Sequence, residues 1–347
     1  MSSRVSGSGG ARFPEVAPLV EVWRGDVVES RHRGGIAVVD AAGRLTRRVG
    51  DARLFTFWRS SSKPLQALPA VLTGAADRYG LEPRHLAVMC GSHVGKDYHV
   101  AVVREILERA RIPEAALHCD RPGRPLARHG CSGKHAGMLV TARHLGEPLE
   151  GYTEPDHPVQ RRIRDVLGRL ADVAAEEIPL ASDGCSVPTF AMALDRMALA
   201  FARLVDPVGL PEDLAAACRQ IVAAMWARPD LLSGAAGDTS DITSALVQAK
   251  AGVLVAKSGA ESLYCVGVAP GVLGPRGVGL AVRAEDGGSV QRSCYLATAE
   301  ALRQLGCLSD PEIELLGSYL GREVRNVHGR VVGHARPCFE LRSGEGE

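Results

Sequence analysis

The sequence is poor in aromatic residues, which make up 4% of its 347 positions, and it carries a net charge of only +1. Its core must therefore consist mainly of Ala, Val and Leu. The charge excludes the strongly basic surface that nucleic-acid binding requires. No apolar run reaches the roughly 18 residues of a membrane-spanning helix. We therefore expect neither nucleic acid nor a membrane as a partner.

The sequence also lacks any Cys-x-x-Cys pair, although it has nine cysteines. An odd number of cysteines in a long chain argues against a disulfide framework and for a reducing compartment. The first residues, MSSRVSGSGGARF, lack the apolar segment of a signal peptide. We expect a cytoplasmic protein with a disordered tail at 1–12, one two-lobed catalytic domain at 13–342 and a short tail at 343–347.

Hydrophobic periodicity predicts an α+β fold. Residues 17–58 alternate apolar and polar positions between Gly-rich turns, which is typical of antiparallel strands, and 252–287 reads as three more strands. Between and after them the period is helical, over 64–79, 97–110, 158–176, 212–228, 240–250 and 289–306. This order is not an alternation of strands and helices. It predicts an antiparallel sheet built from the N- and C-terminal segments, with a mainly helical region between them.

The stretch WRSSSKPLQ contains Ser60-x-x-Lys63, the spacing of a serine nucleophile and a lysine base. On a helical or 3₁₀ turn the two side chains share a face, and a neutral lysine can accept the serine proton. Arg59 would help to keep that lysine neutral. A capped helix start gives the same spacing, and taken alone it is the more common explanation.

A second pattern, Lys257-Ser258-Gly259, follows later in the chain on a predicted strand. A Lys-Ser/Thr-Gly strand is a signature of serine hydrolases that use Ser-x-x-Lys. A polar turn in a surface hairpin is the alternative. Coming after Ser60 and Lys63 in this order, the pattern favours the hydrolase.

Two Gly-flanked segments are further candidates for the site. In MCGSHVGKDYH, glycines surround Ser92 and His93, which suggests close approach of a ligand; a loop without function is the alternative. SDG at 182–184 competes with it for the role of the middle serine-containing motif of the Ser-x-x-Lys hydrolases. The loops HGCSGKHAG and DGCSVP each hold a cysteine, and Cys131, His135 and Cys185 are plausible zinc ligands by type. Their spacing is not a zinc-finger signature, so unremarkable loop cysteines or a nucleophilic thiol remain open at this point.

Five blocks together resemble the class 3, rhizobial-type L-asparaginases, the asparaginase II family. In chain order they are RSSSKPLQALP, CGSHVGKDYH, CSGKHAGML, DGCSVPTFAMAL and VAKSGAES. The resemblance covers residues 17–340 and implies a fold similar to the serine β-lactamases and glutaminases. It also implies a homodimer.

The resemblance implies two serine–lysine pairs at one site, Ser60 with Lys63 and Ser92 with Lys257. Ser60 is favoured as the nucleophile. Zinc ligands fall on Cys131, Lys134 and Cys185, where the lysine would have to be neutral when bound. We expect the substrate to be contacted by Arg59, His93, Asp183 and Gly259, with Asp183 facing its ammonium group.

The implied reaction is hydrolysis of the side-chain amide of L-asparagine through an acyl-enzyme. Lys63 takes the proton of Ser60, whose oxygen attacks the amide carbon, and backbone N–H groups near Ser60 and Gly259 form the oxyanion hole. Zinc is expected to organise the loops, and no organic cofactor is expected. The alternatives are a glutaminase or another Ser-x-x-Lys amidohydrolase, or a non-catalytic protein that binds zinc and asparagine.

Overall fold

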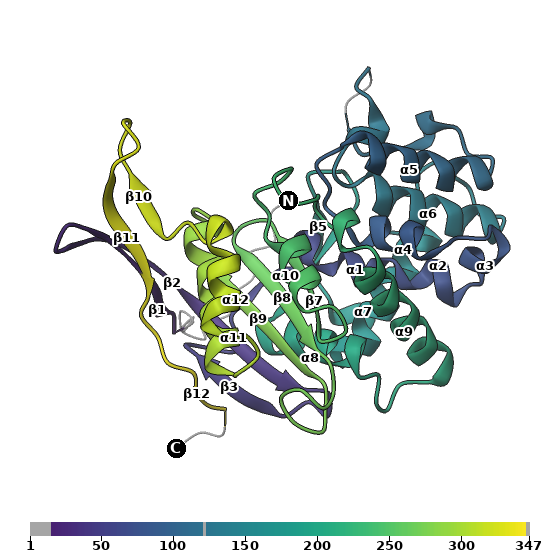
Figure 1. Ribbon diagram of the computed structural model, residues 1–347. Helices are drawn as coiled ribbons and strands as arrows, with labels where there is room; N and C mark the ends of the chain where they lie inside the picture. Colours follow the sequence, from purple (N-terminus) through teal and green to yellow (C-terminus); the bar gives the residue numbers. More distant parts are fainter. Residues whose placement is uncertain (1–14, 121–122, 345–347) are drawn as a thin grey trace, which may run out of the picture.

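The computed structural model describes residues 15–120 and 123–344. Figure 1 shows two lobes, one built from the long strands and the last helices, the other from the helices of the middle of the chain. The predicted tail at 1–12 lies outside the described residues, as do 345–347 of the predicted C-terminal tail. Ser343, which was expected in that tail, belongs to the last strand.

The elements have the following bounds. The strands are β1 Ala17–Arg24, β2 Val27–Asp40, β3 Leu45–Val49, β4 Phe55–Phe57, β5 Leu180–Ser182, β6 Pro188–Ala193, β7 Leu254–Gly259, β8 Leu263–Val268, β9 Val278–Ala284, β10 Glu323–Arg325, β11 Val331–Pro337 and β12 Arg342–Ser343. The α-helices are α1 Lys63–Gln66, α2 Leu68–Leu72, α3 Ala75–Arg78, α4 Pro83–Cys90, α5 Asp97–Arg109, α6 Ser132–His144, α7 Pro158–Ala171, α8 Leu194–Val205, α9 Glu212–Ala227, α10 Thr243–Ala249, α11 Leu296–Gln304 and α12 Asp310–Leu315. Short 3₁₀ turns are η1 Arg59–Ser62, η2 Glu114–Ala116, η3 Leu126–Arg128, η4 Ala175–Glu177, η5 Pro229–Leu231 and η7 Gly317–Tyr319, and a π-helical turn, η6, spans Gln291–Tyr295.

The main sheet joins the two ends of the chain. Its order is β10-β11-β1-β2-β9-β8-β7, with β3 on β2 and β12 on β3, and every pair is antiparallel. The join runs between β2 and β9, where Ile36 pairs with Val282 and Val38 with Leu280. The predicted α+β architecture, with N- and C-terminal segments sharing one antiparallel sheet, is confirmed.

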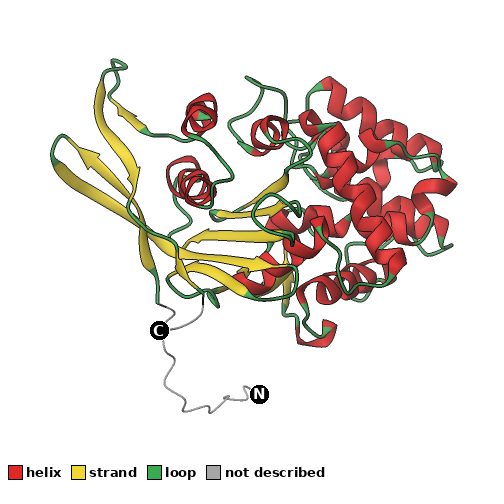
Figure 2. Ribbon diagram, turned by 60° about the horizontal axis from the view of Figure 1, so that its bottom comes forward, coloured by secondary structure: helices red, strands yellow, loops and turns green. Residues whose placement is uncertain are grey.

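Helices cover both faces of the main sheet (Figure 2). The apolar helix α8 packs on β2, β8 and β9, and α11 packs on β1 and β11. Two glycines let α8 approach closely: a Cβ at Gly279 would lie 1.7 Å from the carbonyl oxygen of Ala198, and one at Gly267 would lie 2.6 Å from that of Phe201. Every residue of β8 is buried under α8, and every residue of β7 is buried by η1, α9 and α10, so the strand that carries Lys257 lies in the interior.

The predicted helix at 64–79 is three short helices, α1 to α3. Pro69 lies in the first turn of α2, because a proline is tolerated there but breaks the interior of a helix. Gly74 precedes α3 with a left-handed φ of 78°. The chain therefore changes direction near Pro69 and again at Gly74, where helical periodicity continues without a break. The helices predicted at 97–110, 158–176, 212–228, 240–250 and 289–306 are found as α5, α7, α9, α10 and η6 with α11.

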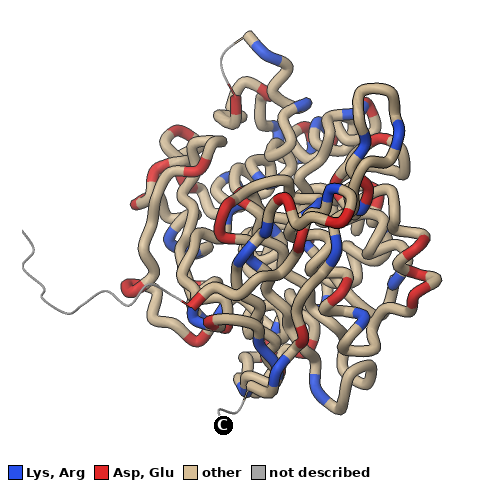
Figure 3. The backbone as a smooth tube through the Cα atoms, turned by 90° about the vertical axis from the view of Figure 1, so that its left-hand side faces the viewer, with Lys and Arg blue, Asp and Glu red and all other residues tan. Residues whose placement is uncertain are grey.

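Acidic and basic residues are interspersed along the chain (Figure 3). Within the part of the chain that the structure describes, no helix has both the length and the apolarity to cross a bilayer.

Candidate active site

The predicted serines and lysines come from elements that meet between the sheet and the helical lobe. Lys63 begins α1 and Ser92 follows α4, while Lys257 lies in β7. Strand β7 packs against η1, and only a glycine fits at 259, because a Cβ there would lie 2.9 Å from the carbonyl oxygen of Trp58. The turn that carries Ser60 is therefore held against the strand that carries Lys257.

Lys63 is fully buried and its ammonium has three acceptors. Nζ lies 2.7 Å from Gly91 O, 2.8 Å from Ser92 Oγ and 3.1 Å from Gly130 O. Burial lowers the pKa of Lys63, because water is replaced by uncharged carbonyls that only partly stabilise the charged form. A neutral amine keeps two N–H donors and a lone pair. The two carbonyls can thus hold the amine while the lone pair faces Ser92 Oγ.

Ser60 is half-buried, and its side chain forms no hydrogen bond with residues 15–120 and 123–344. The contact with Lys63 that its spacing predicted is therefore not a hydrogen bond in this structure: Lys63 reaches Ser92 instead. A buried amine needs several acceptors, and these lie at Gly91 and Gly130. Ser60 keeps an unpartnered hydroxyl.

Ser60 follows a residue with an unusual backbone. Arg59 has a φ of 48°, in the left-handed region that non-glycine residues rarely adopt and that is often found at functional sites. The neighbouring hydroxyls of Ser61 and Ser62 donate to the carbonyls of Trp58 and Arg59. They hold this turn in place, which leaves Ser60 as the serine of the triplet with a free side chain.

Lys257 is bonded to its own neighbour rather than to Ser92. Nζ donates to the carbonyl oxygen and to the hydroxyl of Ser258, both at 2.9 Å, and the Ser258 hydroxyl donates to the Asp241 carboxylate at 2.5 Å. Burial lowers the pKa of Lys257 to about 8, and the charge of Asp241 opposes that shift. The predicted pairing of Ser92 with Lys257 is thus not a direct hydrogen bond in this structure.

Arg59 and Asp183 form an ion pair beside Ser60. Arg59 Nε lies 2.9 Å from Asp183 Oδ1, which also accepts from the backbone N–H of Gly184 at 2.8 Å. The Asp183 side chain is 10% exposed and that of Arg59 28% exposed. A cation and an anion at the rim of one site suit the α-carboxylate and α-ammonium groups of an amino acid.

His93 has both ring nitrogens engaged. Nδ1 accepts from the backbone N–H of Gly95 at 3.2 Å, so Nε2 carries the proton and donates to Ser132 Oγ at 3.0 Å. Burial lowers the pKa of His93 to about 3, so the ring is neutral. His93 anchors the loop after Ser92 to the start of α6. It would have to break one of these bonds to form a polar contact with substrate.

The three predicted zinc ligands also come together. Lys134 Nζ lies 3.1 Å from Cys185 Sγ and 3.9 Å from Asp183 Oδ2. A hydrogen bond from the Cys185 thiol, with Lys63 and Lys134 nearby, lowers the pKa of Cys131, and the same bond raises the pKa of Cys185. The pair thus shares one proton, with the thiolate on Cys131.

This cluster fits zinc by the chemistry of its donors. Two soft sulfurs and an amine converge from two loops, and the thiolate form that binds metal is already favoured at Cys131. Within the described residues no three His, Cys, Asp or Glu side chains gather as a metal site. The predicted set contains only two residues of those types, so Lys134 is the donor that completes it.

Asp241 is the residue of this site that the sequence did not reveal. It lies in SDITSA, just before α10, and its Oδ1 accepts from the backbone N–H of Thr243 at 2.8 Å. An acidic residue before a helix is common as a cap, so the sequence pattern points only to a helix start. Asp241 also accepts a hydrogen bond from Ser258, which in turn accepts one from Lys257. This contact depends on how β7 packs beside α10.

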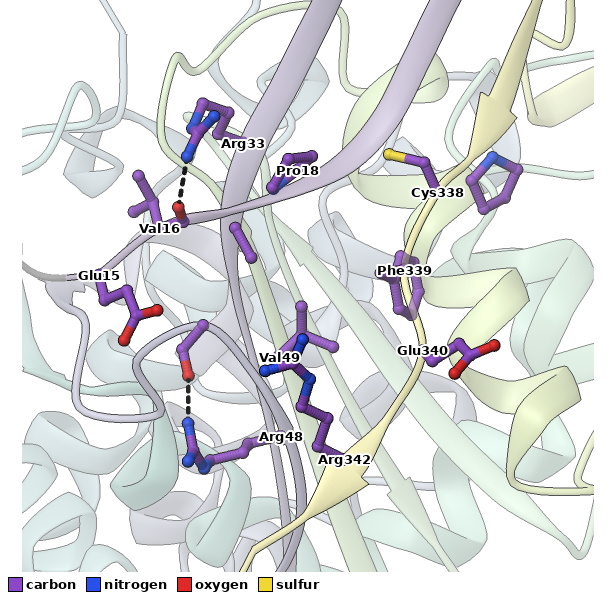
Figure 4. A pocket seen from close by; sticks show the side chains of 13 residues that line it. Glu15, Val16, Pro18, Arg33, Arg48, Val49, Cys338, Phe339, Glu340 and Arg342 are labelled. Atoms are coloured by element: carbon purple, nitrogen blue, oxygen red, sulfur yellow. Dashed lines mark hydrogen bonds between the residues drawn. The ribbon is translucent and has the colours of Figure 1, made fainter. Parts of the chain in front are cut away.

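A surface pocket of about 670 Å³ lies away from this site (Figure 4). It opens beside β1 and the segment leading to β12, and three arginines line it, Arg33, Arg48 and Arg342. Arg33 and Arg48 donate to backbone carbonyls, those of Val16 and Gly50. None of the predicted site residues lines this pocket.

Comparison with known proteins identifies a family. A family model described as L-asparaginase II matches residues 20–337, whereas the curated proteins contain no match.

Solved structures with a similar chain trace include Mglu in its glutamate form, at 17% identity and a TM-score of 0.45, covering 85% of this chain and 66% of that one. Another is a probable glutaminase from Bacillus subtilis complexed with 6-diazo-5-oxo-L-norleucine, at 15% identity and a TM-score of 0.36, covering 79% and 84%. This chain thus spans slightly less than two thirds of the first Mglu chain. At these identities and TM-scores the likenesses carry no inference about function.

Proposed function

The chain belongs to the L-asparaginase II family, and from that premise we propose that it is an amidohydrolase that hydrolyses the side-chain amide of L-asparagine through a serine acyl-enzyme. The observation that carries the mechanism is the buried amine of Lys63, held by two carbonyls with Ser92 Oγ 2.8 Å away. Such an amine is a base enclosed within the protein, beside a hydroxyl that can lose or relay a proton.

Ser60 is the proposed nucleophile. Its hydroxyl is half-buried and unpartnered, next to a strained backbone at Arg59, and nothing needs to be broken before it attacks. Ser92 would carry the proton between the nucleophile and Lys63. The contact between Lys63 and Ser92 equally supports a second assignment, in which Ser92 itself is acylated.

Substrate recognition is proposed to use the pair Arg59 and Asp183. The guanidinium would bind the α-carboxylate and the carboxylate the α-ammonium group, while Gly259 lets the backbone of β7 approach the reacting amide. Glutamine differs from asparagine by one methylene, which is worth about 1–3 kcal/mol in a pocket. Some glutaminase activity is therefore compatible with the same site.

Zinc is proposed to be held by Cys131, Lys134 and Cys185. When bound, it would supply a positive charge that fixes the two thiol loops and raises substrate affinity. Lys134 must lose its proton to bind the metal, so zinc affinity should rise with pH. The homodimer and the cytoplasmic location remain predictions from the family resemblance.

The test is ammonia release from L-asparagine by the purified protein, beside L-glutamine, for the wild type and for Ser60→Ala and Ser92→Ala. Ser61→Ala is the matched control, since it removes the same atom one position along the turn. We expect release to vanish in Ser60→Ala and only to fall in Ser61→Ala, because the Ser61 hydroxyl holds the turn but does not react.

Peptide mapping of the protein trapped during turnover then identifies the acylated serine. A label on Ser92 would move the nucleophile to that residue while leaving the reaction as proposed. No ammonia from either amide, with asparagine still raising the Tm, would favour the binding protein without turnover.

A further inference from the structure

The loop that precedes α10 contacts two other segments of the chain. Near its middle, Asp238 accepts a hydrogen bond from Tyr98 at 3.0 Å and pairs with Lys96 at 2.9 Å. At its end, Asp241 binds Ser258 of β7. The two carboxylates are three residues apart, but only Asp241 is connected to a buried lysine.

The hydrogen bonds of Asp241 have one consistent direction. Oδ1 accepts from the backbone N–H of Thr243, and Oδ2 accepts from the hydroxyl of Ser258. Because the hydroxyl of Ser258 donates its hydrogen bond to the carboxylate, its oxygen is available as an acceptor. Nζ of Lys257 donates to that oxygen at 2.9 Å. This arrangement needs an N–H of Lys257 pointing at Ser258, and the negative charge of Asp241 behind that hydroxyl favours the ammonium form of Lys257 over the neutral amine.

When protonated, Lys257 uses two of its three N–H groups on Ser258, and among residues 15–120 and 123–344 the third has no hydrogen-bond acceptor. The groups that act on Lys257 come from several elements: Asp241 before α10, Lys63 of α1, Cys131 before α6 and Cys90 at the end of α4. Tyr264 of β8 and Tyr295 of η6 lie around Asp241 and feel its charge. Asp241 is the carboxylate in this set, and it opposes both burial and the nearby Lys63.

We propose that Asp241 is a positioning residue that, through Ser258, keeps Lys257 in its ammonium form and aims its free N–H at the leaving nitrogen, so that Lys257 is the acid and Lys63 the base of the reaction. This rests on the amide hydrolysis proposed above. In acylation, Lys63 takes the serine proton, Lys257 gives a proton to the amide nitrogen, and the C–N bond breaks to release ammonia. In deacylation, water gives a proton to neutral Lys257 as its oxygen attacks the ester, and Lys63 returns its proton to the serine oxygen. Both lysines then have their starting protons.

Asp241→Asn tests this assignment with little change of shape. The amide oxygen can still accept from Thr243, but the amide N–H₂ now donates to the Ser258 hydroxyl. The Ser258 hydroxyl can then no longer donate to residue 241. The acceptor beside it is Nζ of Lys257, which can accept a hydrogen bond only as a neutral amine with a lone pair. The variant therefore reverses the chain and favours neutral Lys257.

The first measurement is the pH profile of kcat/KM for L-asparagine. The alkaline limb reports loss of the Lys257 proton, and we expect Asp241→Asn to move it to lower pH by about 1–2 units, since a nearby opposite charge shifts a pKa by about 1–3. Asp238→Asn, the same change in the same loop, should leave the limb in place. An unmoved limb in Asp241→Asn overturns the proposal.

The second measurement does not need activity: the Tm of wild type and Asp241→Asn between pH 6 and pH 10. Lys257 has a pKa lowered by folding to about 8 from an ordinary value of 10.5, so its unfavourable burial acts below pH 8 and is relieved as pH rises toward 10.5. A further lowering in the variant should reduce its Tm by about 2 °C at pH 6, and the deficit should disappear by pH 10. A deficit that is the same at every pH indicates a purely structural role and overturns the proposal.

Lys257→Met supplies the control background. In it, the deficit caused by Asp241→Asn should lose its pH dependence, because the titrating group is gone. If the wild type releases no ammonia but the pH-dependent deficit and its loss in Lys257→Met are both seen, the proposed substrate fails while the link between Asp241 and Lys257 stands. If ammonia is released normally and neither readout moves, the reaction stands and the role of Asp241 fails.

Discussion

Lys63 and Lys134 are two buried lysines on either side of Cys131, and their pKa values move in opposite directions. Burial lowers the proton affinity of both. The hydrogen bonds of Lys63 go to carbonyls and a hydroxyl, which carry no charge, and the nearby Cys131 opposes burial there without outweighing it. Lys134 lies among Cys131, Cys185 and Asp183, and the negative charge of this group outweighs burial. The partners of a buried lysine, and not its depth, decide whether it can act as a base.

The largest expected effect comes from removing the base. Lys63→Met should reduce kcat for ammonia release by about 10³-fold, within the range usual for a general base. The Tm should not fall greatly, because the variant replaces a buried amine with an apolar side chain of similar length. A near-normal rate with a normal Tm would contradict the role given to Lys63.

Lys134→Met should affect zinc binding and KM more than kcat. We expect it to abolish zinc binding, measured as metal content per chain after dialysis, and to raise KM more than it lowers kcat, because the metal organises the site. Removing zinc from the wild type with a chelator should have the same signature. A complete loss of kcat that zinc restores would instead mean that the metal takes part in the chemical step.

Asp183→Asn removes one negative charge from the surroundings of Lys134, keeps the shape of the side chain and leaves the hydrogen-bond partners of Lys63 unchanged. It removes the nearer charged partner of Arg59, which keeps Glu261 at 3.9 Å. We expect KM for L-asparagine to rise about 10- to 100-fold, with a smaller change in kcat, since loss of one charged hydrogen bond is worth about 1.5–3 kcal/mol. An unchanged KM would show that the substrate ammonium group binds elsewhere.

The smallest effect on stability is expected from Glu312→Gln, which breaks the ion pair of a lysine outside the site. Lys250 Nζ lies 2.5 Å from Glu312 Oε1, and hydrogen bonds from Lys250 and Ser309 lower the pKa of Glu312 to about 2. A lowered carboxyl pKa stabilises the fold above its ordinary value near 4.5, and that stability is lost as pH falls toward 2. Glu312→Gln should therefore lower the Tm by about 1 °C at pH 7 and by less at pH 3, with no change in ammonia release.

Much of the site could be predicted from the sequence because each predicted residue lies in a block whose local pattern is distinctive. The Ser60 turn, the Gly-flanked Ser92 and the strand with Lys257 are each predicted by their own local pattern, and the family resemblance is confirmed by the match over residues 20–337. The rhizobial-type class remains a prediction. Local spacing was a poor guide to which serine each lysine contacts, because Lys63 reaches across to the end of α4.

The same contrast holds for the fold. Strands were predicted over 17–58 and 252–287, and their shared sheet followed from the strand–helix–strand order, but the join through β2 and β9 was not predicted. The strands β5, β6, β10, β11 and β12 were not predicted either. The helical stretch predicted at 64–79 is found as three short helices, because Pro69 and Gly74 redirect the chain. The helices α4, α6 and α8 were not predicted. Most of α6 is buried on all sides, with Gly133 and Gly137 packed against α4, and so it has no polar face to give a periodic signal.

By itself, the sequence determined the residue types of the site, their order along the chain and the antiparallel α+β class, because these depend on local periodicity and on short motifs. Tertiary structure alone decided the partners of each buried lysine and thiol: carbonyls and Ser92 for Lys63, Ser258 and Asp241 for Lys257, and Cys185 and Asp183 for Lys134. Protonation depends on the charges within a few ångströms of a buried group. Those charges come from segments far apart in the chain, so no local pattern can specify them.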